Sequence, residues 1–116
     1  MTRKTAPRDF ARDSESWPRS VVDDAAAEVV QAMARALADA LEADERSLRQ
    51  FAAGSGVKRQ AIADLLVGRC WPDVATVVRL ENFLAMQLYP LRDGIRNPHE
   101  NRPFRPQWHP VPGTAK

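Results

Sequence analysis

The sequence predicts an all-α fold, and three observations carry that prediction. Apolar residues recur at three- and four-residue spacing in four separate stretches, which is the pattern of a helix with one buried face. Three of these stretches follow a residue that caps helix N-termini well, and glycine follows two of them. Alanine, a strong helix former, is concentrated in the first stretch.

The first helix is predicted over residues 20–43. Ser20 followed by Asp23 gives an acidic pattern like a capping box at its start. Its last turn is acidic, which the helix dipole disfavours, so fraying is expected there. The apolar positions that define its buried face are Val21, Val22, Ala25, Val29, Met33, Leu37 and Leu41.

Two short helices are predicted next, over residues 48–54 and 58–67. Ser47 followed by Gln50 forms a capping box for the first of them. A turn containing Gly56 joins the two, and glycine suits the left-handed conformation of a helix C-terminus. The buried positions expected in this pair are Leu48, Phe51, Ala52, Ala61, Ile62, Leu65 and Leu66.

The fourth helix is predicted over residues 74–86, with Asp73 as its N-cap. A last helical turn is expected near residues 88–91. Trp71, in the turn before the fourth helix, is interpreted as a hydrophobic plug under that loop. The buried face of the fourth helix would contain Val74, Val77, Val78, Leu80, Phe83 and Leu84.

Three segments are expected along the chain. Residues 1–16 are polar and aperiodic, and we interpret them as a flexible basic arm. Residues 17–91 form the helical domain. Residues 92–116 contain five prolines and are expected to be an extended tail, which nevertheless carries Phe104 and Trp108.

Composition excludes several classes of protein. With 116 residues the chain has the length of one domain, and no apolar run approaches a membrane span or a signal peptide, so we expect a soluble cytoplasmic protein. Cys70 is the single cysteine and cannot form an internal disulfide. His99 and His109 lack metal-ligand spacing. We therefore expect no metal or cofactor, and the absence of any recognisable catalytic set argues against an enzyme.

The charges are segregated along the chain although the net charge is only +2. Residues 21–45 carry one basic and seven acidic side chains, a net charge of −6. Residues 46–69 carry five basic side chains and one acidic, a net charge of +4. A locally basic segment can attract a polyanion even when the total charge is small.

The stretch SLRQFAAGSGVKRQAIADLLVGRCWPDVATVVRLENFL resembles the helix-turn-helix domain of the Xre family, the group of the lambda repressor and Cro. The resemblance covers about residues 35–91. In detail, this stretch is similar to small actinobacterial regulators. It implies a lambda-repressor-like domain of four or five helices. The residues that carry it are Ser47, Phe51, Ala52, Gly56, Val57, Ile62, Gly68, Pro72, Thr76, Leu80 and Leu84.

The resemblance implies that the helix at 58–67 reads base edges in the major groove of DNA. Arg59 suits bidentate binding to guanine, and Gln60 suits adenine. Ala63 could contact a thymine methyl group. Asp64 could accept from cytosine, or it could orient Arg59.

The resemblance also implies a set of phosphate contacts. The N-terminus of the helix at 48–54 offers free amides and the positive end of its dipole. Leu48 replaces the glutamine common there, and Lys58 replaces the usual capping serine or threonine. Ala85-Met86 replaces the usual Gly-Val after the fourth helix. The expected phosphate contacts are Arg46, Ser47, Leu48, Arg49, Lys58 and Arg69.

The function that the resemblance implies is a sequence-specific regulator of transcription at the bacterial nucleoid, of host or phage origin and most often a repressor. A homodimer on a palindromic duplex site is expected, because one recognition helix reads only a few base pairs. The alternative is an antitoxin or adaptor-type interaction module whose C-terminal tail binds a partner protein.

Overall fold

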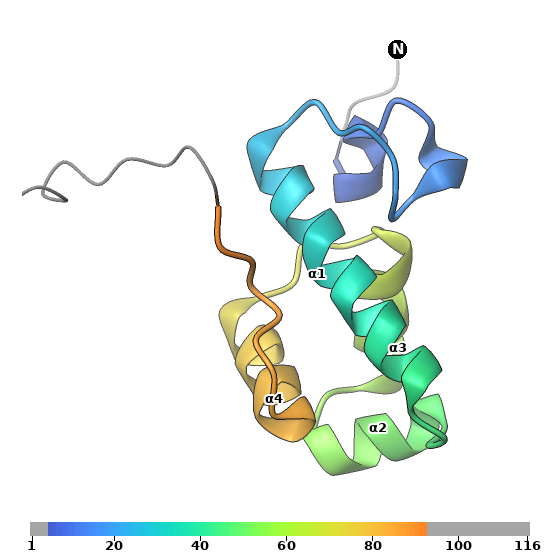
Figure 1. Cartoon of the computed structure of the whole chain (residues 1–116), viewed down its shortest axis with the longest axis vertical. Helices are drawn as coiled ribbons and strands as arrows, with labels where there is room; N and C mark the ends of the chain where they lie inside the picture. Colours follow the sequence, from blue (N-terminus) through green and yellow to red (C-terminus); the bar gives the residue numbers. More distant parts are fainter. Residues whose placement is uncertain (1–4, 93–116) are drawn as a thin grey trace, which may run out of the picture.

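The computed structural model describes residues 5–92, which form four α-helices preceded by two short 3-10 helices (Figure 1). The described part contains no β-strand, so the predicted all-α class is confirmed. The tail beyond Arg92, with Phe104, Trp108, His99 and His109, lies outside the described residues. The elements are η1 (Pro7–Phe10), η2 (Ser14–Ser16), α1 (Ala25–Ala43), α2 (Leu48–Ser55), α3 (Arg59–Val67) and α4 (Val74–Leu84).

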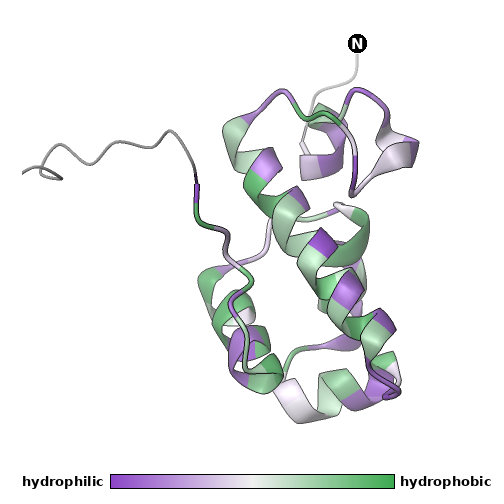
Figure 2. Cartoon of the chain, viewed as in Figure 1, coloured by the Kyte–Doolittle hydropathy of each residue, from purple (hydrophilic) through white to green (hydrophobic). Residues whose placement is uncertain are grey.

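The core lies between α1 and the three shorter helices. α1 packs against η1 and α3, while α2 packs against both α3 and α4. Figure 2 shows hydrophilic residues recurring along the visible face of α1, which leaves its apolar face for the core. The buried cluster consists of Val29, Val30, Met33, Leu37, Phe51, Val57, Ile62, Leu65, Val77, Leu80 and Leu88.

The predicted start of the first helix is wrong by five residues. The helix begins at Ala25, where the Asp24 carboxylate accepts a hydrogen bond of 2.9 Å from the Ala27 amide. Ser20 does not cap it, because the Gln31 side chain holds both the amide and the carbonyl of Ser20, each at 2.9 Å. The stretch before α1 is therefore extended and paired, with Val22 bridged to Ala11.

The segment from Thr5 to Ser16 corrects the predicted flexible arm of residues 1–16. Pro7 is buried, and the Arg8 amide donates to the Gly68 carbonyl at 2.9 Å. The Arg12 guanidinium forms an ion pair with Asp23 at 2.9 Å. The folded part therefore begins at least twelve residues before the predicted domain boundary at residue 17, with Thr5 already tied to Asp9 by a hydrogen bond.

The end of α4 also differs from the prediction. The helix ends at Leu84, and Ala85 takes the left-handed conformation with φ 55°. No helical turn follows at residues 88–91; Leu88 is instead buried, and the Glu81 carboxylate accepts from its amide at 2.7 Å. One carboxylate thus holds the chain against α4 after the helix has ended.

Ala85→Gly is expected to raise the free energy of unfolding by about 1 kcal/mol, because a Cβ is unfavourable at a left-handed helix end. Chemical denaturation followed by circular dichroism measures the change. The matched control is Ala53→Gly at an exposed position inside α2, which should lower stability by about 1 kcal/mol through helix propensity. Equal effects of the two substitutions would contradict the prediction.

Candidate functional site

α2 and α3 form a corner with only Gly56, Val57 and Lys58 between them. Gly56 has φ 78°, the left-handed conformation predicted for it. Val57 is 5% exposed and joins Phe51 and Ile62 in the core. The predicted packing of this pair is confirmed, so the two helices are held at a fixed mutual orientation by buried side chains.

The predicted capping box at the start of α2 is confirmed. The Gln50 amide donates to the Ser47 hydroxyl at 3.1 Å, and the Ser47 amide donates to the Gln50 side chain at 2.7 Å. Within residues 5–92, no hydrogen bond occupies the amides of Leu48 and Arg49. The capping box therefore consumes the Ser47 side chain, while the two amides that follow stay available to an acceptor.

The exposed side of α3 begins with Arg59 and Gln60, both solvent-accessible. Ala63 and Asp64 lie one turn further on and are half-buried. Lys58 precedes the helix at its N-cap and makes no side-chain capping bond, as its substitution for serine or threonine predicts. The four predicted base-contacting residues thus lie on one side of α3, but with unequal access.

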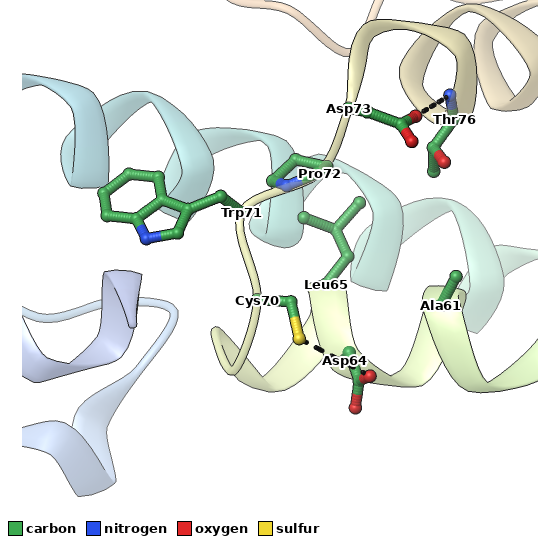
Figure 3. Close-up of a pocket in the computed structure, with 8 residues that line it drawn as sticks. All are labelled: Ala61, Asp64, Leu65, Cys70, Trp71, Pro72, Asp73 and Thr76. Carbon is green, nitrogen blue, oxygen red and sulfur yellow. Dashed lines mark hydrogen bonds between the residues drawn. The ribbon is translucent and has the colours of Figure 1, made fainter. Parts of the chain in front are cut away.

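Asp64 is the centre of a hydrogen-bond network, of which Figure 3 shows the bond from the Cys70 thiol. Its carboxylate accepts hydrogen bonds from the side-chain amide of Gln60 at 2.9 Å, from the Arg69 guanidinium at 3.0 Å and from the Cys70 thiol at 3.7 Å. The hydrogen bond from Gln60 is the largest of the causes that lower the pKa of Asp64. Asp64 therefore orients Gln60 and Arg69, whereas Arg59, the partner considered from the sequence, is not among its contacts.

The predicted phosphate-contacting cations fall into two groups. Arg46 and Arg69 are engaged within the protein, by Asp44 at 2.8 Å and by Asp64 at 3.0 Å. The hydrogen bonds from the Arg46 side chain lower the pKa of Asp44 to about 2. The Arg46 guanidinium also lies over the Phe83 ring, 4.5 Å from its centre.

Arg49, Lys58 and Arg59 form the second group, and we call them the free cations. All three are exposed, and no carboxylate of residues 5–92 forms an ion pair with any of them. They lie in the first turn of α2, at the N-cap of α3 and at its first residue. The helix corner therefore presents positive charge that the rest of the described chain does not neutralise.

The N-terminal segment covers the C-terminal end of α3, which the sequence analysis did not predict. The indole of Trp17 donates to the Leu66 carbonyl at 3.0 Å, one of the last helix carbonyls that lack a partner inside the helix. The Gly68 carbonyl accepts from Arg8. The one sequence feature that could have indicated this contact is Trp17 itself, a large aromatic residue among polar neighbours.

Trp71 is not the predicted plug under its loop. Its indole is 43% exposed, donates to the Thr5 carbonyl at 2.9 Å and meets the Phe10 ring edge-on at 6.3 Å. Figure 3 shows the indole pointing away from the other residues that line a pocket of about 180 Å³, toward the N-terminal segment. Trp71 therefore joins the N-terminal segment to the loop between α3 and α4.

No three histidine, cysteine, aspartate or glutamate side chains of residues 5–92 are grouped to hold a metal ion. None of the helices in this part is both long and apolar enough to cross a membrane. Comparisons with family models, with curated proteins and with solved structures found no match to this chain.

Proposed function

We propose that this protein binds duplex DNA as a lambda-repressor-like helix-turn-helix regulator of the Xre type, with α3 in the major groove. The observation that supports it best is the position of the free cations Arg49, Lys58 and Arg59 on two helices joined by a three-residue turn. Helix-turn-helix proteins place the second of two such helices in the groove.

The electrostatics of the corner favour a polyanion as the ligand. Cations already paired with carboxylates gain little from a phosphate, because the existing ion pair must be broken first. Free cations instead release condensed counterions from DNA when they bind, which gives affinity that falls with salt. The acidic stretch 21–45, whose net charge is −6, cancels this charge in the total of +2, although no carboxylate of residues 5–92 forms an ion pair with the free cations.

Base recognition falls to the two exposed residues at the start of α3. The Arg59 guanidinium can donate two hydrogen bonds to guanine, one to O6 and one to N7. Gln60 reads adenine through its amide, whose orientation Asp64 holds at 2.9 Å. In this proposal Asp64 acts through Gln60 and Arg69 and is not itself the reader of a base.

Phosphate contacts come from α2. The Leu48 and Arg49 amides point out of the first turn of an eight-residue helix, where the helix dipole favours an anion. Arg49 and Lys58 add side-chain charge on either side of this turn. A homodimer on a palindromic site completes the proposal, because a single α3 spans only a few base pairs.

Arg59→Ala tests the assignment of α3. We expect the variant to lose about 1–3 kcal/mol of binding free energy and to relax its preference at one base position. Selection of oligonucleotides from a random pool, followed by gel-shift titration of the selected site, measures both quantities. Arg79→Ala, which removes one positive charge from an exposed position on α4, is the matched control. Unchanged affinity and unchanged selected sequence in Arg59→Ala would contradict the proposal.

A further inference from the structure

An apolar groove of about 420 Å³ lies between the start of α1 and the segments that follow α3 and α4. Its α1 wall contains Ala25, Ala26 and Val29, and its other wall contains Trp71, Pro72 and Tyr89. Trp71 and Tyr89 are 43% and 49% exposed, which is high for aromatic rings beside a core. The groove is thus open and partly lined by aromatic rings.

We propose that the segment 103–108 of this chain, PFRPQW, occupies this groove. Pro103 and Pro106 are three residues apart, the spacing that polyproline II segments present to aromatic-lined grooves. Phe104 and Trp108 supply the apolar side chains that such a groove accepts. The proposal does not depend on DNA binding.

The position of Arg92 argues for an occupant from the same chain. Arg92 is the last described residue and itself lines the groove, so the described part of the chain ends at the rim of the site. The eleven residues from Arg92 to Pro103 reach roughly 35 Å when extended, which allows the chain to turn back. Closing so short a loop costs little entropy compared with bringing in a second molecule.

Paramagnetic relaxation in the full chain tests the proposal. A nitroxide on Val111→Cys, in a Cys70→Ser background, should remove amide signal intensity at Ala25, Ala26 and Tyr89. Amides of α2 should keep their intensity. Reduction of the nitroxide should restore all signals. Intensity lost evenly over the surface, or nowhere, would overturn the proposal.

Variants and mixing separate the possible occupants. Tyr89→Ser should abolish the effect, as should the double change Phe104→Ser and Trp108→Ser, while Val78→Ser should leave it intact. Val78 is the matched control because, contrary to its predicted burial, it is 44% exposed on α4 and does not line the groove. A mixture tests for an occupant from a second molecule. Isotope-labelled chains without nitroxide, mixed with unlabelled chains that carry it, should lose no amide signal intensity. Loss in that mixture would assign the groove to a second copy and overturn the proposal.

Discussion

Trp17→Ala should lower the free energy of unfolding by about 3 kcal/mol, a value near the lower end of that for large aromatic residues in protein cores. The indole packs against the core cluster and donates to the Leu66 carbonyl at 3.0 Å. Its removal leaves a cavity over the end of α3 and an unpaired helix carbonyl. Urea denaturation followed by circular dichroism measures the loss.

Two further variants separate the parts of this contact. Trp17→Phe keeps most of the ring but loses the donor, and should cost about 1 kcal/mol. Gly68→Ala disturbs the same contact from the C-cap of α3, because a Cβ there would lie 2.5 Å from Cε2 of Trp17. The φ of 72° at Gly68 adds a conformational cost for any residue with a side chain. In the Trp17→Ala background the cost of Gly68→Ala should fall to about 1 kcal/mol, which covers the left-handed conformation and the remaining 3.0 Å approach to Cβ of Arg8. Additive costs would show that Trp17 and Gly68 do not interact.

The core of the helix corner was predictable because its signals are local. Ser47 and Gln50 lie three residues apart, and their capping box depends on nothing beyond that turn. Leu48 and Phe51 on α2, and Ile62 and Leu65 on α3, are each three residues apart, a spacing that defines a buried face whatever lies opposite. Phe51, Ile62 and Leu65 are buried in the structure, as predicted.

The N-terminal segment was not predictable from local pattern, because its contacts are long-range. Trp71 and Thr5 are 66 residues apart, and Trp17 and Leu66 are 49 apart. Nothing in the polar sequence before Trp17 indicates a partner at the end of α3. The early start predicted for the first helix has a similar cause, since the Gln31 side chain and Ala11 hold residues 20–22 extended.

The candidate site was predictable in its residues but not in its pairing. The sequence does not distinguish among the basic residues of the corner, yet Arg46 and Arg69 form ion pairs at 2.8 and 3.0 Å. The partner of Arg46 is Asp44, two residues away, where the sequence alone indicates only an unfavourable charge at a helix end. The sequence predicts that Asp64 accepts from cytosine or orients Arg59, and its contacts with Gln60 and Arg69 emerge only from the fold.

The double change Arg49→Ala and Lys58→Ala should weaken DNA binding strongly and by the same factor on every sequence. Both residues are exposed and form no ion pair with a carboxylate of residues 5–92, and in the proposed complex both contact phosphates. Each lost phosphate contact lowers the dependence of log K on log salt by about 0.9, so the slope should fall by about 2. Fluorescence anisotropy titrations at several salt concentrations, on the selected site and on a scrambled duplex, measure it.

The control is the double change Arg12→Ala and Arg19→Ala, which removes the same net charge from the N-terminal side. Those residues are already paired with Asp23 and Asp39, and both pairs are solvent-exposed, so little stability is lost. If binding depended only on net charge, the two double variants would lower the slope equally. A larger fall for Arg49 and Lys58 would instead locate the phosphate contacts at the helix corner. The distinction rests on position, because the acidic stretch 21–45 makes the total charge of +2 uninformative.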